Sequence, residues 1–463
     1  MILTPWKSGA GRAGVCLAIG ALLLPAGSSA QRSGAPSPAV LARMWDAEHV
    51  SPPASPLVDH AEVKARVQAI AAGTTGVLRV REVGRSLEGR QLWDVAFGTG
   101  PLVVLMWSQM HGDEATATSA LFDLYEYIRR HEKNQAVGQL LSALTVHTVP
   151  MLNPDGAERF HRRNAQGIDI NRDALLLQSP EGRVLKELRD SLTPAVGFNL
   201  HNQSWRTTAG QPPRGAAISL LAVAQDEARS MTEGRLLTRR LGSVVRDALE
   251  PFALHRIGRY DDSFEVRAFG DNLALWGTPV LLIETGPWPA ANPDPMLVRL
   301  NYTALITALH ALADGSVHRA DPARYDSLPE NESGGLYTAI RNVTIVTGTG
   351  IPPFTGDVGL VAQRRVRLEG GQRQLVLLQA VEDIGDLRTL GALFEVDGAG
   401  RVLAPLQAGA VVGDEVSLSA GEMALTITIG APADLMLLRP LQDGRYHVER
   451  VFRGLQPVPA IGS

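Results

Sequence analysis

Two histidines and two glutamates in this sequence have the side-chain types and spacing of a metal site. His111 and Glu114 form a His-x-x-Glu pair, and His201 and Glu284 each follow a short apolar run. Two imidazoles and one carboxylate, with a fourth position left for water, are a ligand set of catalytic zinc. The His-x-x-Glu pair alone is weak evidence. It recurs by chance, and taken alone it is more typical of a surface histidine followed by a solvated glutamate.

These residues need strands that bring them together, and the surrounding pattern predicts such strands. Short continuous apolar runs are typical of strands covered by helices on both faces. They occur at residues 102–107, 144–149, 196–200 and 280–283. Apolar residues recur at helical spacing between them. In open α/β sheets ligands bind beyond the carboxyl ends of the strands. We therefore expect three strands to deliver His111 with Glu114, His201 and Glu284 to one edge of a sheet.

The chain of 463 residues is long for one domain, and its pattern changes along its length. Residues 60–313 read as an α/β domain, and residues 314–335 as a linker. Residues 336–463 alternate short strands with Gly-rich turns, and Asp397-Gly398 and Asp443-Gly444 have the composition of hairpin tips. We predict a small, all-β, sandwich-like module there.

The first thirty residues have the pattern of a secretory signal. Lys7 and Arg12 precede a short apolar segment, and Ser28-Ser29-Ala30 offers small residues for cleavage. A membrane anchor is the alternative, but a span needs about 20 apolar residues and this segment is shorter. We predict a signal peptide over 1–30, a flexible lead-in over 31–59, and no stable membrane span after cleavage.

The composition indicates in which compartment the protein functions and which class of partner it does not bind. Cys16, within the signal, is the only cysteine, so the mature chain would have no disulfide and no thiol nucleophile. An export signal without disulfides fits a bacterial periplasmic or extracellular protein. The net charge of −4 comes without a basic run, which argues against nucleic acid as a partner.

A block between the two predicted metal-binding segments resembles the zinc carboxypeptidase A family. It comprises Asn153-Pro-Asp-Gly156, Arg162-Arg163-Asn164 and Gly167-Ile-Asp169-Ile-Asn171-Arg172. The order of segments is also similar: His-x-x-Glu, this block, Leu200-His201-Asn202, and a late glutamate in Leu282-Ile-Glu-Thr. The resemblance covers roughly residues 60–313. It implies that family's fold, a mixed and mostly parallel sheet flanked by helices.

The resemblance further implies a metallocarboxypeptidase with one Zn²⁺ per chain. His111, Glu114 and His201 would hold the ion. Asp169 would orient His111, and Glu284 would be the general base that activates the zinc-bound water. Water bound to zinc has a pKa of about 7, so hydroxide is available at neutral pH.

Four further residues would handle the substrate, a peptide with a free C-terminal carboxylate. Arg162 matches the arginine that stabilises the oxyanion, and Asn171 and Arg172 match the pair that binds the terminal carboxylate. Tyr260 is the candidate for the family's mobile capping tyrosine, although residues 261–276 do not match the best-known members.

Other functions stay open at this point. One is an N-acyl amino-acid amidohydrolase or deacylase, or a cell-wall peptide hydrolase, of the same superfamily. His201-Asn202 suits a deacylase, whereas the block over 153–172 favours peptides. Another is a non-catalytic peptide-binding protein, since a fold alone does not establish activity. Trp205 and Trp288 follow the predicted catalytic segments and either line a specificity pocket or pack in the core.

Overall fold

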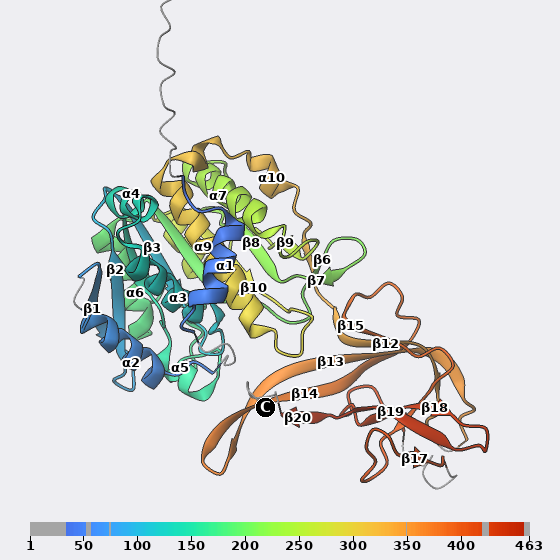
Figure 1. Ribbon diagram of the computed structural model, residues 1–463. Helices are drawn as coiled ribbons and strands as arrows, with labels where there is room; N and C mark the ends of the chain where they lie inside the picture. Colours follow the sequence, from blue (N-terminus) through green and yellow to red (C-terminus); the bar gives the residue numbers. More distant parts are fainter. Residues whose placement is uncertain (1–33, 52–56, 74–75, 349, 419–425, 458–463) are drawn as a thin grey trace, which may run out of the picture. The chain divides into compact units, whose positions relative to one another are not determined.

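The computed structural model describes residues 34–51, 57–73, 76–348, 350–418 and 426–457. Residues 35–463 form one unit (Figure 1). The predicted signal peptide over 1–30 lies outside the described residues and stays a prediction.

An eight-stranded sheet forms the centre of the first region. Its strands are β1 (Leu78–Arg85), β2 (Gln91–Phe97), β3 (Leu102–Ser108), β4 (Leu144–Val149), β5 (Val196–Asn202), β8 (Ile218–Ala222), β9 (Ile257–Arg259) and β10 (Val280–Thr285). They lie in the order β1-β2-β4-β3-β5-β10-β8-β9. The β4-β3-β5-β10 pairs and β8-β9 are parallel, and the other pairs are antiparallel. The predicted mixed, mostly parallel sheet is confirmed.

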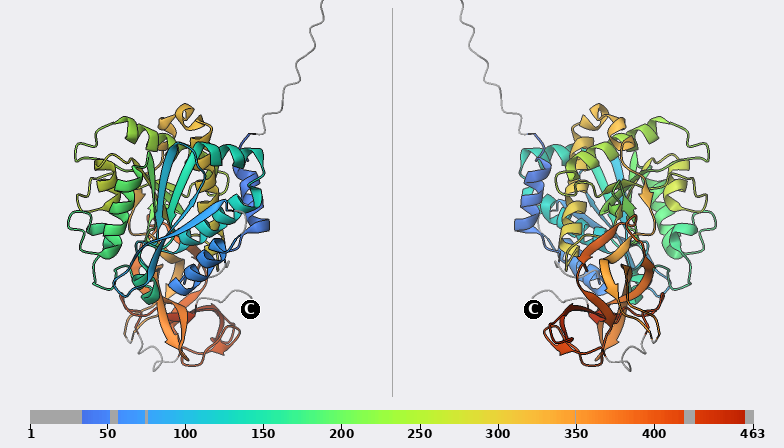
Figure 2. Two further views of the ribbon diagram at one scale, coloured as in Figure 1. Left: turned by 90° about the vertical axis from the view of Figure 1, so that its left-hand side faces the viewer. Right: turned by 90° about the vertical axis from the view of Figure 1, so that its right-hand side faces the viewer.

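Helices cover both faces of this sheet (Figure 2). One face carries α1 (Pro38–Glu48), α2 (His60–Ala71), α3 (Thr116–His131), α4 (Gln135–Ala143), α7 (Glu233–Leu249) and α9 (Asp294–Ala313). The other face carries α6 (Pro180–Leu192) and α8 (Phe269–Leu275). Alternate residues of one strand enter the two cores: Leu281 and Ile283 pack on the first, and Val280 and Leu282 on the second. This two-sided burial explains why the strands read as continuous apolar runs.

Helix α9 belongs to the core despite its apolar length. Among the described residues it alone is long and apolar enough to cross a membrane, and 78% of that window is buried inside the fold. Its contacts with α3 and α7 account for that burial.

Part of the predicted lead-in is a packed helix, so the expectation of a flexible segment over 31–59 is wrong for α1. Ser37 caps its start by accepting a hydrogen bond from Val40, and Pro38 occupies the first turn. Leu41 and Trp45, four residues apart, are buried, and the Trp45 indole donates to Asp123 at 2.7 Å. Pro38 is therefore a helix-start residue and not the sign of a flexible segment.

The predicted linker over 314–335 is likewise structured and packed on the first region. It contains η2 (Ser316–Arg319), α10 (Pro322–Asp326) and β11 (Asn331–Glu332). Tyr325 of α10 is buried, and its hydroxyl accepts a hydrogen bond from the backbone of Ala222 in β8 at 2.9 Å. β11 pairs with β6 (Thr208–Ala209), which pairs with β7 (Arg214–Gly215). The segment therefore extends the first region rather than spacing it from the next.

The C-terminal residues form a separate all-β sheet, as predicted. Its strands are β12 (Leu336–Ile345), β13 (Phe354–Glu369), β14 (Gln372–Gly385), β15 (Ala392–Asp397), β16 (Val402–Pro405), β17 (Glu415–Val416), β18 (Leu435–Pro440), β19 (Tyr446–Phe452) and β20 (Leu455–Pro457). Hydrogen bonds join them into one nine-stranded sheet in the order β17-β19-β18-β16-β12-β13-β14-β20, with β15 also on β12. A sandwich-like module was expected, and the hydrogen bonds between strands connect all nine of them into one continuous sheet.

The two Asp-Gly turns differ. Asp443-Gly444 joins the antiparallel strands β18 and β19 and is a hairpin tip, as expected. Asp397-Gly398 joins β15 to β16, and both strands run parallel to β12, so this turn is not a hairpin. A glycine is needed at position 398 because an added Cβ would lie 2.5 Å from the Val343 side chain.

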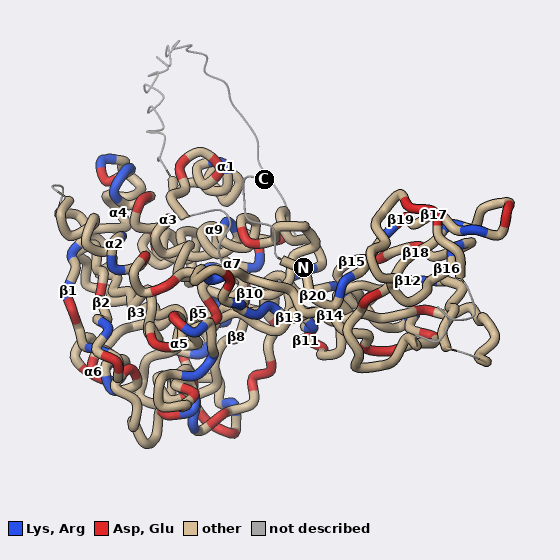
Figure 3. The backbone as a smooth tube through the Cα atoms, turned by 90° about the horizontal axis from the view of Figure 1, so that it is seen from below, with Lys and Arg blue, Asp and Glu red and all other residues tan. Residues whose placement is uncertain are grey.

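Several contacts join the two regions. Arg206 pairs with Glu382 at 2.6 Å, and Arg373, near the β13–β14 turn, donates to the carbonyl of Ala157 at 2.9 Å. Acidic and basic residues are interspersed along both regions of the described chain (Figure 3).

Candidate active site

The carboxyl ends of three adjacent parallel strands meet at the candidate site. β3, β5 and β10 are neighbours in the sheet, and His201 of β5 is the register partner of Glu284 in β10. His111 comes three residues after β3 ends. Parallel strands end at the same edge, so these side chains gather there.

A tight turn between β3 and α3 directs His111 and Glu114 to one point. Gln109 has a φ of 51°, and its side-chain amide donates to the carbonyl of Gly112 at 3.0 Å. Gly112 packs on Gly156 of α5 (Pro154–Arg159), where an added Cβ would lie 2.0 Å from a backbone carbon. Only glycine fits this approach, which holds the turn against the Asn-Pro-Asp-Gly segment.

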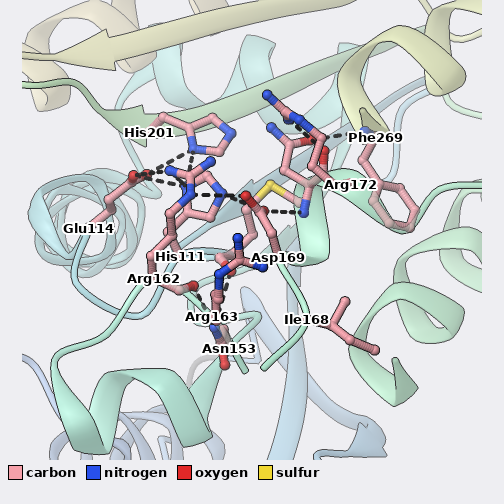
Figure 4. Close-up of polar contacts among 12 residues, drawn as sticks. His111, Glu114, Asn153, Arg162, Arg163, Ile168, Asp169, Arg172, His201 and Phe269 are labelled. Carbon is pink, nitrogen blue, oxygen red and sulfur yellow. Dashed lines mark hydrogen bonds and ion pairs between the residues drawn. The ribbon is translucent and has the colours of Figure 1, made fainter. Parts of the chain in front are cut away.

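Ligand-type atoms of three buried side chains converge there (Figure 4). Nδ1 of His111 lies 2.8 Å from Oε1 of Glu114, and Nδ1 of His201 lies 2.8 Å from Oε2 of the same carboxylate. The two Nδ1 atoms are 3.2 Å apart. The backbone N–H of Asn202 donates to Oε2 of Glu114 at 3.1 Å, which fixes the carboxylate.

This donor set fits a zinc ion. Zinc takes imidazole nitrogen and carboxylate oxygen at about 2.0–2.2 Å, which places tetrahedral ligand atoms roughly 3.3–3.6 Å apart. The candidate ligand atoms all lie within 4.8 Å of one another. One cation among them would use both imidazole lone pairs and balance the carboxylate charge.

The electrostatics of the cluster show how a metal ion would compete with protons. Burial would lower the pKa of His111, but the Glu114 carboxylate and the hydrogen bond to Asp169 raise it to about 9. Burial would raise the pKa of Glu114, yet the two imidazoles hold it well below its ordinary value. Burial lowers the pKa of His201. A metal ion would therefore displace a proton from His111.

Asp169 holds the side of the His111 ring that faces away from the cluster. Its Oδ1 lies 3.1 Å from Nε2 of His111, and its Oδ2 accepts from Nε of Arg162 at 2.9 Å. Burial would raise the pKa of Asp169, but His111 and Arg162 keep it below its ordinary value. An ionised Asp169 requires the proton on Nε2, so Nδ1 keeps the lone pair that a metal needs.

We expect Asp169→Asn to weaken zinc binding by about 10- to 100-fold, the usual effect of losing a partner that orients a ligand. The substitution keeps the shape and removes the charge that fixes the His111 tautomer. Competition with a chelator measures the affinity. Asp94→Asn is the matched control, because Asp94 is a buried partner of His147, 2.8 Å away, outside this cluster. Equal affinity in both variants would show that another group orients His111.

The residues predicted to bind a carboxylate lie beside Asp169 on η1 (Ile170–Arg172) (Figure 4). The backbone of Asn171 donates to Asp169 at 3.0 Å, and its side-chain oxygen accepts from the backbone of Phe269 at 2.9 Å. Arg172 donates to the carbonyl of Asn171 at 2.7 Å, and its side chain is 36% exposed. The guanidinium thus keeps donors on its accessible side.

Arg162, Glu284 and Tyr260 lie around the same centre. Nη1 of Arg162 is 3.1 Å from Nδ1 of His111. Burial and the negative charge of Glu114 raise the pKa of Glu284 to about 8, and its buried Oε2 has no hydrogen-bond partner among the described residues. Tyr260, which follows β9, is 38% exposed. Burial raises its pKa, as does the nearby charge of Glu284.

The sequence analysis does not name one neighbour of the site, Glu265, and it does not assign Asn202 its contact with Glu114. Glu265 lies 3.4 Å from Arg172 and also pairs with Arg267 at 3.0 Å. It stands in the segment that does not match the best-known family members, so the sequence offers no signal for it. Asn202 supports Glu114 through its backbone, and only its position after His201 could have indicated this.

Residues 63–204 match the zinc carboxypeptidase family. This part of the chain is similar to zinc carboxypeptidases. The matched range includes His111, Glu114 and His201, whereas Glu284 lies beyond it. The position of Glu284 beside the candidate ligands is therefore an observation of the structure, through its register with His201.

Curated proteins to which the chain is similar are carboxypeptidases. The human carboxypeptidase N catalytic chain is 32% identical over 119 residues, 21% of this chain and 26% of that protein. Mouse carboxypeptidase M is 25% identical over 163 residues, 30% of this chain and 37% of that protein. The alignments thus span about a quarter to a third of those relatives. A solved metallo-carboxypeptidase from Burkholderia cenocepacia is 18% identical, with a TM-score of 0.45 over 55% of this chain and 69% of that one.

Proposed function

We propose that this protein is a zinc-dependent carboxypeptidase that removes C-terminal residues from peptides. The observation that carries the proposal is the juxtaposition of His111, Glu114 and His201 with the buried carboxylate of Glu284. A metal set that only stabilised the fold would need no unpartnered carboxylate beside it.

The ligand set leaves room for a catalytic function. Zinc held by these three side chains would act as a Lewis acid and lower the pKa of a bound water to about 7. Glu284 takes the proton of the attacking water and passes it to the leaving amine. Burial raises the pKa of Glu284, which makes its carboxylate a stronger proton acceptor than that of an exposed glutamate.

Arg162 and Arg172 would each bind a different negative charge of the substrate. Arg162, beside His111 and Glu114, would pair with negative charge that develops on the carbonyl oxygen. Arg172, with the amide of Asn171, would bind the terminal carboxylate of the substrate. The guanidinium stays charged throughout, so neither step alters its protonation.

The test of this function is the requirement for a free C-terminus. We expect the wild type to cleave a peptide acid about 10- to 150-fold faster, in kcat/KM, than its C-terminal amide. That factor corresponds to a charge-assisted contact of about 1.5–3 kcal/mol. Arg172→Ala should lose most of this preference, because the guanidinium that pairs with the charge of the peptide acid is then gone. The measurement is kcat/KM for one peptide in both forms with both proteins.

Arg267→Ala is the matched control, since Arg267 pairs with the same Glu265 and is placed on no proposed substrate group. It should keep the acid preference. Equal cleavage of acid and amide by the wild type would contradict the carboxypeptidase assignment. It would favour an amidohydrolase or an endopeptidase instead.

A further inference from the structure

A pocket at the junction of the α/β region and the C-terminal sheet has no part in the reaction described above. It has a volume of about 200 Å³. Trp205 and Pro293 line it from the first region, and Tyr337, Arg364 and Phe394 line it from the second. Pockets for whole drug-sized ligands have about 300–1,000 Å³. This junction pocket is therefore closer in size to a single side chain.

Three aromatic rings give the junction pocket its character. Trp205 and Tyr337 stack with ring centroids 5.6 Å apart, and Phe394 meets Tyr337 edge-on at 5.2 Å. All three rings are partly exposed, so they present apolar surface to the pocket. Such a surface favours an apolar or aromatic side chain over a charged one.

Arg364 connects the pocket to the two segments that follow His201 and Glu284. Its two terminal nitrogens donate to the two oxygens of Asp294 at 3.0 and 3.1 Å, and its guanidinium carbon lies 4.4 Å from the centroid of the Trp205 ring. Both side chains of the ion pair are largely buried. Asp294 begins α9, in the segment after Glu284, and Trp205 comes four residues after His201. One residue of the C-terminal sheet thus holds both segments that leave the site.

The chain limits how far the pocket can lie from the metal ligands. Four residues span at most about 14 Å, so the Cα atoms of Trp205 and His201 are no farther apart than about four extended peptide steps. The pocket also lies on the opposite side of the sheet edge from Arg172. η1 packs with α6 and α8 through Ile170, whereas the pocket lies at the start of α9, which covers the other face.

This placement decides which part of a peptide reaches the pocket. A carboxypeptidase substrate has a single residue beyond the scissile bond, and Arg172 would bind the end of that residue. A peptide whose end is bound by Arg172 would extend away from Arg172, and the pocket lies on that side of the sheet edge.

We infer that the junction pocket binds an apolar or aromatic side chain of the substrate, upstream of the scissile bond and within about four residues of it. The C-terminal sheet thereby contributes directly to peptide recognition. The inference rests on the proposed carboxypeptidase function.

The first test uses the wild-type, metal-loaded protein and a set of blocked hexapeptides with one constant C-terminal residue. Phenylalanine replaces glycine at each of the four upstream positions in turn. A hydrophobic pocket typically discriminates by about 10- to 200-fold, so phenylalanine at one of these positions should raise kcat/KM by at least about 10-fold. Cleavage of all peptides at similar rates would overturn the inference that the junction pocket binds a substrate side chain. Failure to release the C-terminal residue from any peptide, including a blocked dipeptide, would instead overturn the proposed function.

The second test removes the pocket wall. Trp205→Ala should reduce the phenylalanine preference to within about 3-fold and leave the kcat/KM of the blocked dipeptide within about 3-fold of wild type, because the dipeptide does not reach the pocket. Phe354→Ala is the control: Phe354 is an exposed aromatic residue of the same sheet, outside the pocket lining, and its variant should keep the preference. A preference that survives in Trp205→Ala and in Phe394→Ala would contradict the inference. The wild-type scan decides independently of how these variants fold.

Discussion

Replacing Glu284 with glutamine should leave the zinc content unchanged and reduce kcat/KM by about 10²- to 10⁴-fold, the usual contribution of a positioned general base. Glutamine keeps the size and shape of the side chain and cannot accept a proton. Glu284 holds none of the converging ligand atoms, so the metal set of His111, Glu114 and His201 stays complete. The pair of measurements is elemental analysis and steady-state kinetics on a peptide acid.

The control for this substitution is Glu181→Gln. Glu181 is a buried glutamate with a pKa raised by burial, and its carboxylate accepts from Asn164 at 3.1 Å, away from the cluster. Its variant should retain activity, which would show that neutralising any buried carboxylate is not enough. If Glu284→Gln kept activity within a few-fold of wild type, another group would have to take the proton. If it lost its zinc, Glu284 would belong to the ligand set.

The apolar strands, and the residues that follow them at the sheet edge, could be predicted from the sequence because both faces of the sheet are buried. The run over 102–107 shows no alternation, since Val104 and Leu105 pack in different cores. Such a run indicates a covered strand without further information, and the residue after it is then expected at the sheet edge. That is why His201 and Glu284 could be placed near each other before their register was known.

The helix α1 and the segment over 314–335 were misjudged for a different reason. Local composition there is rich in proline and polar residues, which is typical of loops. The stabilising contacts are distant in sequence, such as Trp45 with Asp123 and Tyr325 with Ala222. Tertiary packing overrides local preference in such segments, and a single sequence carries no sign of the partner.

The surroundings of Arg172 show the same limit within the site. Its neighbour Glu265 is 93 positions away in the chain, and no spacing rule connects the two. The junction pocket is a stronger case, because Trp205 and Tyr337 are contributed by two regions that the sequence presents as independent domains. Sequence motifs therefore predict the metal-binding and charged residues of the site. The residues that line the substrate site come together through contacts that only the fold reveals.

Replacing His201 with alanine should remove zinc from the protein and abolish peptide cleavage. Loss of a residue that merely orients a ligand costs about 10- to 100-fold in metal affinity, so loss of a ligand itself should exceed that range. His201 contributes one of the three converging atoms, and its removal leaves a two-ligand site in which Glu114 keeps His111 and the backbone of Asn202 as partners. Elemental analysis after dialysis should find about one zinc per wild-type chain and little in the variant.

Thermal unfolding gives a second readout of this substitution that does not depend on activity. A ligand that binds only the folded state stabilises it, by about 2.7 kcal/mol at a free concentration of 100 times its Kd. A chelator should therefore lower the Tm of the wild type and leave that of His201→Ala nearly unchanged. His147→Ala removes an imidazole that pairs with Asp94 outside the cluster, and it should keep both the zinc and the chelator effect. Full zinc content in His201→Ala, or a chelator effect equal to that of the wild type, would exclude His201 from the metal site. The remaining pair, His111 and Glu114, would then need a ligand from elsewhere in the chain.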